Sequence, residues 1–577
     1  MPAVSLTDPM NTMEPADGPM RQRTQRFSVE PGLPWLWIVA AVFLVAVPVG
    51  GMLWRSLLDP ETGAIGLGNY TAVLSEAGIP TAVFNSLWIG VATTVGSLVI
   101  AVPFAFLVSR TDMPGRRMFR SVAVLTFAAP SFIAAMGWIL LLGPRGGLIN
   151  EYVLAPLGLP TFDVFGAGGI VLVLVFFLYP LVFLPVADAL DNMDPRLEEA
   201  AESLGAGRLR TLRRVTLPLV TPPMFSGSLL VFISAFVIFG PVALLGGPVG
   251  FETIPTAMLK LMSFPPRIEL AAVLGLPVLV VLGALLVVQR RVYGRRRYTT
   301  LGGKPAHRQV TALGRWRWPA WLFGVAVMMV SVVLPFGVLL LTSFRKAIGL
   351  PLRPENLVLF DNYRALLEQP EILLSFANSL WISLVATVLA LAVAVLAGWL
   401  RERARLAWLR PSISPAMLAP LAFPGAILGI AMIVTYAAGP FWLGGTLGIM
   451  LLAYVIRVVP QSFTYVQAGF TQLNSETEEA ARSLGATWTE SMSRITVPLL
   501  RGPILSIGVL NFVLLFRELD VSIFLYTGGN GVAPVILYNL ASESRFQLMG
   551  ALSVVMLAVN LGVVLLARRL LGVRLTQ

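Results

Sequence analysis

The chain has 577 residues, of which 56% are hydrophobic and only 12% are charged, about half the charged share of a soluble globular protein. Apolar runs of about twenty residues recur without the alternation of a β-barrel, so we expect an all-α polytopic membrane protein. The net charge is +12, but no polar segment is long enough to form a basic nucleic-acid-binding domain. The chain has no cysteine and one histidine, His307 in the linker, so we predict no metal site.

The N-terminal segment, residues 1–34, is polar, and we expect it to be a disordered cytoplasmic tail. The apolar run that follows is too long for a signal-peptide core and has no clear cleavage site, so we interpret it as a retained first membrane helix. The apolar runs together predict about twelve spans, at roughly 35–57, 84–109, 120–142, 167–189, 219–245, 269–290, 319–343, 377–400, 413–437, 443–467, 499–526 and 547–568.

Arginine-rich loops indicate the orientation of these spans. Basic residues favour the cytoplasmic side of a membrane, and the sequence after every even-numbered span is basic. We therefore predict a multi-pass protein of the bacterial inner membrane with both termini in the cytoplasm. The loop 344–376 fits the rule least well, because it carries four basic residues on the opposite side.

The sequence divides into two similar halves. The segment 199–218 aligns without a gap with 479–498, at an offset of 280, and ten of the twenty positions are identical. The tetrapeptide Asn-Ser-Leu-Trp at 85–88 recurs at 378–381, at an offset of 293. We therefore expect two parallel repeats of six spans each. The predicted units are a first half over 35–290, a basic cytoplasmic linker over 291–318 and a second half over 319–577.

Each half carries a polar loop that contains a Glu-Ala-Ala triplet. Small and apolar residues recur at helical spacing in this loop, and Asp194-Pro195 before the first copy is a signal for the start of a helix. Gly205 and Gly485 then end the short helix or allow a sharp turn. One such loop is compatible with an ordinary interfacial helix, but two copies with matched spacing indicate a docking surface that is used twice.

The triplet, the glycine after it and the Leu-Pro or Val-Pro pair further on resemble the coupling loop of ABC importer permeases of the type I class. Each half is similar to one such permease, with cores at about 81–287 and 374–567, so the chain resembles two fused permeases. The resemblance implies docking to two copies of a cytoplasmic ATP-binding subunit and delivery of solute by a periplasmic binding protein. The residues that take the coupling role by resemblance are Glu199, Ala200, Ala201, Gly205, Pro218, Glu479, Ala480, Ala481, Gly485 and Pro498.

The two loops differ in charge, and the chain lacks an ATP site. Arg482 stands where the first copy has Glu202, so the two docking surfaces are not electrostatically equivalent. No Gly-x-x-x-x-Gly-Lys-Ser/Thr phosphate loop occurs in the sequence. We therefore expect a non-catalytic subunit that binds no cofactor, with ATP on its partner subunits.

Four charged residues lie well inside predicted spans, away from the span ends on the cytoplasmic side. Arg517, Glu518 and Asp520 lie well into the eleventh span, roughly 28 Å beyond Pro498 and close to the outer side, and Arg457 lies in the tenth span. Charges inside spans are functional candidates, and the matching positions of the first half are uncharged. Two interpretations stay open: an ion pair at the outer interface, or a periplasmic gate or cation-attracting patch on the translocation path. Because an unpaired charge is costly there, Arg457 is a candidate partner of Glu518 or Asp520.

The substrate is less defined than the class of transporter. The fused arrangement of this chain resembles permeases for ferric iron and for thiamine. The segment 517–543 is most similar to the ferric-iron group. The alternative is thiamine or another small polar solute, such as a phosphonate or a polyamine. Of other classes, a secondary transporter also has twelve spans in two halves, but it does not need a duplicated cytoplasmic helix.

Overall fold

The computed structural model describes residues 32–60, 62–194, 196–295, 311–404, 408–474 and 476–571. Within these ranges the chain is helical and its extended pairings are isolated bridges, so the predicted all-α class is confirmed. The predicted tail up to residue 31, His307 and the linker from 296 to 310 lie outside the described residues. The boundaries drawn between the domains stay predictions.

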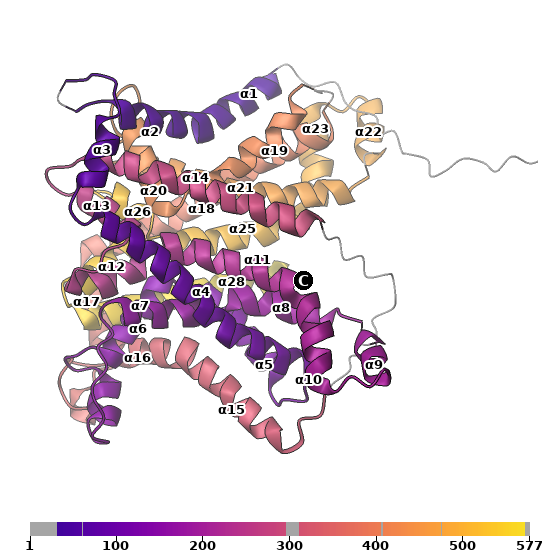
Figure 1. The fold of residues 1–577 in the computed structure, drawn as a ribbon. Helices are drawn as coiled ribbons and strands as arrows, with labels where there is room; N and C mark the ends of the chain where they lie inside the picture. The colour runs from indigo at the N-terminus through magenta and orange to yellow at the C-terminus, as the bar shows by residue number, and fades with distance from the viewer. Residues whose placement is uncertain are drawn as a thin grey trace, which may run out of the picture.

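Long apolar helices run side by side between the two ends of the molecule (Figure 1). Apolar runs form helices in a membrane because a helix satisfies its own backbone groups. The long helices of the first half are α1 (Gly32–Ala41), α2 (Val47–Leu57), α4 (Ile79–Arg110), α5 (Arg116–Ala128), α6 (Ser131–Leu142), α7 (Ala167–Leu178), α8 (Pro180–Asp191), α11 (Leu217–Val237) and α14 (Ile268–Arg295). Those of the second half are α15 (Arg317–Met328), α16 (Leu334–Ser343), α18 (Pro370–Glu402), α19 (Arg410–Leu418), α20 (Gly425–Met432), α21 (Leu447–Gln472), α25 (Arg501–Phe516) and α28 (Phe546–Leu571).

Nine helical stretches of the described chain are long and apolar enough to cross a membrane, and four more pairs of helices are bent at a break. Two bent pairs correct predictions of continuous spans, because the segments predicted at 120–142 and 413–437 bend by 104° and 105°. A third bend, of 75°, lies at Leu500, where the span predicted at 499–526 begins. With them the predicted total of about twelve spans is confirmed. The fourth pair, α12 (Gly240–Gly246) with α13 (Ile254–Leu261), was not predicted as a separate hairpin.

Proline explains two of the breaks. Ala129 and Phe423 each precede a proline and have extended backbone, with ψ of 149° and 103°. A proline ring clashes with a helical conformation of the residue before it, so α5 and the short helix before Phe423 end there. The predicted span at 219–245 is also shorter than expected, because α11 ends at Val237.

The first helices of each half pack against the other half. α2 lies against α14 of its own half and against α20 of the second half, whereas α16 lies against α6 of the first half. The Tyr436 hydroxyl donates a hydrogen bond to the carbonyl of Phe43. Gly137 approaches the backbone carbonyl of Pro335 so closely that a Cβ atom there would overlap it. The two halves are therefore interlocked.

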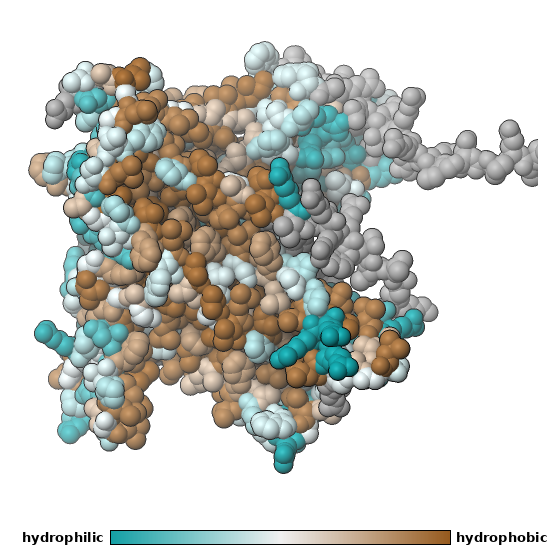
Figure 2. Space-filling view, in the orientation of Figure 1, coloured by the Kyte–Doolittle hydropathy of each residue, from teal (hydrophilic) through white to brown (hydrophobic). Residues whose placement is uncertain are grey.

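Each half has the same core of three helices. α4, α8 and α11 pack together in the first half, as do α18, α21 and α25 in the second. Figure 2 shows that hydrophobic residues cover the middle of the visible surface, whereas hydrophilic residues gather toward its two ends. Exposed side chains in the apolar belt include Phe84, Val99 and Leu384. Such an extended apolar surface fits contact with lipid.

Candidate functional site

Two short helices lie at one end of the molecule, beyond the ends of the long helices (Figure 1). They are α9 (Arg196–Ser203) and α22 (Glu476–Ser483), which contain the two Glu-Ala-Ala triplets. Acidic residues occupy the first turn of each helix, where the helix dipole favours negative charge. The structure thus forms both short helices where the sequence predicts them.

Matched residues begin and end the two helices. The side chains of Asp194 and Asn474 each accept a hydrogen bond from the backbone amide two residues later, at 3.0 and 3.3 Å. Gly205 and Gly485 follow the helices with φ of +79° and +90°, a left-handed conformation that glycine adopts without strain. Nothing lies within 4 Å of a Cβ atom built at either glycine. Backbone conformation, rather than space, therefore requires glycine here.

The outer faces of these helices are available to a partner. Leu204 and Leu484, at equivalent positions, are each 89% exposed. Glu199, Ala200 and Ala480 are exposed as well. Of the other predicted coupling residues, Ala201, Glu479 and Ala481 are partly exposed, and Gly205, Pro218, Gly485 and Pro498 are exposed. A single exposed leucine is common on protein surfaces, but its recurrence at the equivalent position of both loops fits a docking role, which stays a prediction.

Glu198 fixes α9 to the end of the second span. Its Oε1 accepts a hydrogen bond from the Thr216 hydroxyl at 2.6 Å, and its Oε2 lies 3.8 Å from Nη1 of Arg110. Arg110 also donates from Nη2 to the carbonyl of Met193 at 3.5 Å. Because Arg110 ends α4 and Thr216 precedes α11, this network joins the short helix to two core helices.

Glu478 makes the same connection in the second half, with one more partner. Its Oε1 accepts hydrogen bonds from Nε1 of Trp399 at 2.7 Å and from the Thr496 hydroxyl at 3.2 Å. Its Oε2 lies 3.4 Å from Nε of Arg403, whose Nη2 donates to the Leu473 carbonyl at 2.7 Å. The side chains of Glu478 and Arg403 are 8% and 7% exposed, so this pair is buried.

Sequence reasoning did not single out these anchoring residues. The signal was present, since Glu198 and Glu478 match at the offset of 280, as do Thr216 and Thr496. Arg110 matches Arg403 at the other offset, 293. The arginines were interpreted only as markers of orientation, and neither glutamate was given a role.

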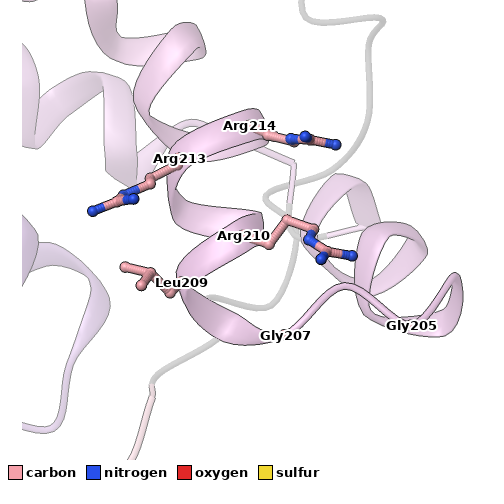
Figure 3. Close-up of a pocket in the computed structure, with 6 residues that line it drawn as sticks. All are labelled: Gly205, Gly207, Leu209, Arg210, Arg213 and Arg214. Atoms are coloured by element: carbon pink, nitrogen blue, oxygen red, sulfur yellow. The ribbon is translucent and has the colours of Figure 1, made fainter.

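The segments that follow the two short helices differ in charge. In the first half a hollow of about 610 Å³ is lined by Gly205, Gly207, Leu209, Arg210, Arg213 and Arg214, whose guanidinium groups point in different directions away from the backbone (Figure 3). At the matching positions of the three arginines, the second half has Glu490, Ser493 and Arg494. Hydrogen bonds from the backbone amide and the hydroxyl of Thr487 lower the pKa of the Glu490 carboxyl, which stays ionised. The predicted electrostatic difference between the loops thus extends beyond Arg482.

The predicted charges of the eleventh span lie in a break. α25 ends at Phe516, and Arg517, Glu518 and Asp520 follow before α26 (Ser522–Leu525). The expectation that they lie inside a continuous helix is therefore wrong. The helix α25 begins directly after the bend at Leu500. Counted along its 16 residues, the three charges lie about 24 Å from that bend.

Two arginines satisfy carbonyl groups that the proline breaks leave open. Nη1 of Arg457 lies 3.4 Å from the carbonyl oxygen of Phe423, and Nη1 of Arg517 donates to the carbonyl of Ala129. The last carbonyls of a helix have no partner within that helix, so a donor from elsewhere must satisfy them. Ala129 belongs to the first half, so Arg517 bonds across the junction of the two halves.

The acidic members of this cluster are held by both halves. Nε of Arg457 lies 3.6 Å from Oε2 of Glu518, whose side chain is only 8% exposed. The backbone of Gly240, from the first half, hydrogen-bonds Asp520. A Cβ atom at Gly425 would lie 2.5 Å from that of Asp520, so small residues let these segments approach. The structure therefore brings the four predicted charges together, with Arg457 as a partner of Glu518.

A comparison with known protein families identifies the chain. Residues 98–298 and 386–573 both match the family described as the inner membrane component of binding-protein-dependent transport systems. The family pattern thus occurs twice and covers more than half of the chain.

Individual relatives resemble the whole chain or one of its halves. A probable ABC transporter permease, y4fN of Sinorhizobium fredii, is 26% identical in an alignment that covers 93% of this chain and 96% of that protein. The ferric transport system permease FbpB of Actinobacillus pleuropneumoniae is 24% identical over 92% of this chain and 76% of its own length. The spermidine/putrescine permease PotB of Escherichia coli is 27% identical over 44% of this chain and 96% of its own length.

The double match, the repeated helices and the multiple apolar spans agree with one another. The chain therefore belongs to the family of binding-protein-dependent transport system inner membrane components, as a fused two-domain ABC importer permease with multiple spans in the inner membrane.

Proposed function

We propose that the chain is the membrane subunit of an ATP-driven importer for ferric iron. The observation that carries this proposal is similarity to ferric transport permeases over most of the chain, 92% for one and 86% for another. Polyamines are the second candidate, because PotB of Escherichia coli matches a half-length segment at comparable identity. Thiamine or a phosphonate stays a more distant alternative.

The two loops supply the proposed coupling surface. Each copy of a cytoplasmic ATPase would receive one of the helices α9 and α22, with the exposed Leu204 or Leu484 against its cleft. The subunit itself is not an enzyme in this proposal, since the sequence has no phosphate loop. A solute-binding protein on the outer side would deliver the cargo.

The anchoring networks suggest how movement of the ATPase reaches the membrane core. A displacement of α9 pulls on Glu198, which contacts both Arg110 at the end of α4 and Thr216 before α11. The same connection runs through Glu478 to α18 and toward α25. Ion pairs and hydrogen bonds of this length transmit displacement because they cannot stretch far without breaking.

The charge cluster is the proposed gate of the translocation path. Arg457, Arg517, Glu518 and Asp520 lie where broken helices of the two halves meet, and two of their contacts cross from one half to the other. Rotation of the halves away from each other would break these contacts together. Iron would pass as cargo, since the described residues hold no group of three acidic or histidine side chains suited to a metal ion.

The orientation of the chain belongs to the same proposal. α9 and α22 would face the cytoplasm, as would both termini, because the arginine-rich loops lie on that side. Reporter fusions at 115, 205, 300, 405 and 490 are expected to report cytoplasm, and fusions near 155, 255, 355 and 535 the outer side. A reversal within the first group would contradict this topology.

Reconstituted transport tests the proposed substrate. The chain would be placed in liposomes with the ATPase and binding protein encoded beside its gene, and uptake of radioactive ferric iron, putrescine and thiamine would be compared with and without ATP inside. Iron uptake that requires ATP supports the proposal. ATP-dependent uptake of putrescine without iron uptake would instead support the polyamine alternative.

A further inference from the structure

Arg457 lies near the middle of a membrane helix. It is about 15 Å along α21 from Leu447 and about 22 Å from Gln472. Its side chain is nevertheless 31% exposed. An arginine this far from both helix ends is too deep to reach the membrane surface, and hydrocarbon strongly disfavours its charge. We therefore expect the exposed part of this side chain to face water inside the protein rather than lipid.

Part of the guanidinium group is free to bind something else. Nε faces Glu518 at 3.6 Å and Nη1 faces the Phe423 carbonyl at 3.4 Å. Among the described residues, Nη2 has no recorded partner. Guanidinium donors are arranged as a planar fork that matches the oxygens of a carboxylate or phosphate.

A polar amide lies one helical turn from Arg457 on the same face of α21. Gln461 is partly exposed, and its Nε2 donates to Oδ1 of Asn511 at 2.7 Å. Asn511 is fully buried and donates in turn to the Ser462 hydroxyl at 2.8 Å. The amide of Gln461 is thus held in one orientation beside the free guanidinium nitrogen.

The first half has none of this polarity. At the positions of Arg457, Gln461 and Asn511 it has Phe177, Leu181 and Val231. The second half alone therefore provides a polar wall, and the first half offers an apolar one for comparison.

The exposure of the four charges in the cluster differs. Arg457, Arg517 and Asp520 are partly exposed, whereas Glu518 is buried. The cluster has two cations and two anions, so attraction of an anion depends on the donors that Arg457 leaves free rather than on net charge.

We propose that Arg457 and Gln461 form an oxyanion-binding site on the translocation path, so that the solute passes as an anion or with an anionic oxygen group exposed. The proposal rests on the proposed function and deepens it. An iron cargo would then travel with its own oxygen ligands rather than as a bare cation, which the guanidinium would repel.

The cysteine-free chain allows a direct test. Gln461→Cys would place one thiol beside Arg457, and Leu181→Cys would place the matched thiol in the first half. Both variants, purified in nanodiscs, would react with an anionic sulfonatoethyl and a cationic trimethylammonioethyl methanethiosulfonate, and each rate would be divided by that of a free thiol. At Gln461→Cys we expect the anionic reagent to react about tenfold faster than the cationic one.

Further measurements separate the possible outcomes. Adding Arg457→Gln should abolish the preference at position 461, inorganic phosphate should slow the anionic reagent there, and Leu181→Cys should show no preference. Equal rates at Gln461→Cys, or no reaction with either reagent, would overturn the proposal. ATP-dependent uptake by the unmodified chain is measured separately, so a failed anion site is distinguishable from a failed assignment as an iron importer.

Discussion

The loops proposed to face the ATPase and the charge cluster between the halves differ in how far they follow the internal repeat. At the loops, helix starts, glycines, exposed leucines and anchoring glutamates occur in pairs. At the cluster, Arg517, Glu518 and Asp520 replace Val237, Ile238 and Gly240, so the charges come from the second half alone. Symmetry is retained where two copies of one partner would bind, and it is lost where a single solute would pass.

The proposed path for the solute is single and has no need of matched walls. One half can therefore provide charges while the other provides backbone groups, as Ala129 and Gly240 do here. This division also halves the number of charges that must be buried, each of which is costly in a membrane. The following changes would break or sharpen the comparison.

The largest effect is expected at the cluster. The double substitution Glu518→Gln with Asp520→Asn leaves Arg457 and Arg517 without their acidic partners. We expect uptake per molecule to fall at least about tenfold, since removing one side of a buried ion pair costs about 3–5 kcal/mol. Uptake and membrane abundance should be measured together, with Glu543→Gln, an exposed acid, as the control. Normal uptake at normal abundance would make the cluster an interfacial ion pair only.

At the loops, bulky residues at the glycines should uncouple transport. Gly205→Val or Gly485→Val forces a β-branched residue into a left-handed conformation, at a cost of about 1–2 kcal/mol, and adds bulk to the docking face. We expect uptake to fall by about tenfold for either variant with the chain still inserted. Asparagine tolerates this conformation, so Gly205→Asn is the matched control for strain. Wild-type uptake in both valine variants would remove the docking role.

The anchoring glutamates should differ in their effect on stability. Glu478→Gln breaks a buried pair with Arg403 and should lower the free energy of unfolding by about 3 kcal/mol. Glu198→Gln loses a looser contact and should cost about 1 kcal/mol. Thermal unfolding in detergent measures both. Equal losses would show that the two anchors are more alike than their geometry suggests.

The smallest effect is expected from exchanging the loop charges. Glu202→Arg combined with Arg482→Glu transfers the sign difference from one copy to the other without changing the total charge. Exposed charges contribute about 0–1 kcal/mol, so uptake should change by no more than about fivefold. If the exchange abolishes ATPase binding, the two loops recognise their partners differently.

The sequence predicted the elements whose signal is local. Apolar runs indicated the helices, and the spacing of Asp194, the Glu-Ala-Ala triplet and Gly205 indicated the short helix and its end. Pro130 and Pro424 mark places where a helix can break, but the sequence did not show that each span would bend by more than 100°. A proline identifies a weak point in a helix, while the bend depends on what packs against it.

Contacts between distant segments were largely beyond the sequence. The pairing of Arg457 with Glu518 was suggested by charge, because an unpaired charge in a span is costly. Arg517 reaching Ala129 was not, since a backbone carbonyl has no sequence signature. The burial of Glu478 was missed because nothing in the sequence distinguishes it from its partly exposed neighbour Glu479.

The packing of α2 and α16 against the opposite half has a consequence for the synthesis of the protein. The face of α6 that receives α16 is not covered until the chain has been extended by about two hundred residues, past Pro335. During that interval the face of α6 around Gly137 lacks the neighbour that it has in the folded protein. A single polypeptide ensures that the missing helix arrives beside its own acceptor, whereas two separate subunits would have to find each other by diffusion in the bilayer.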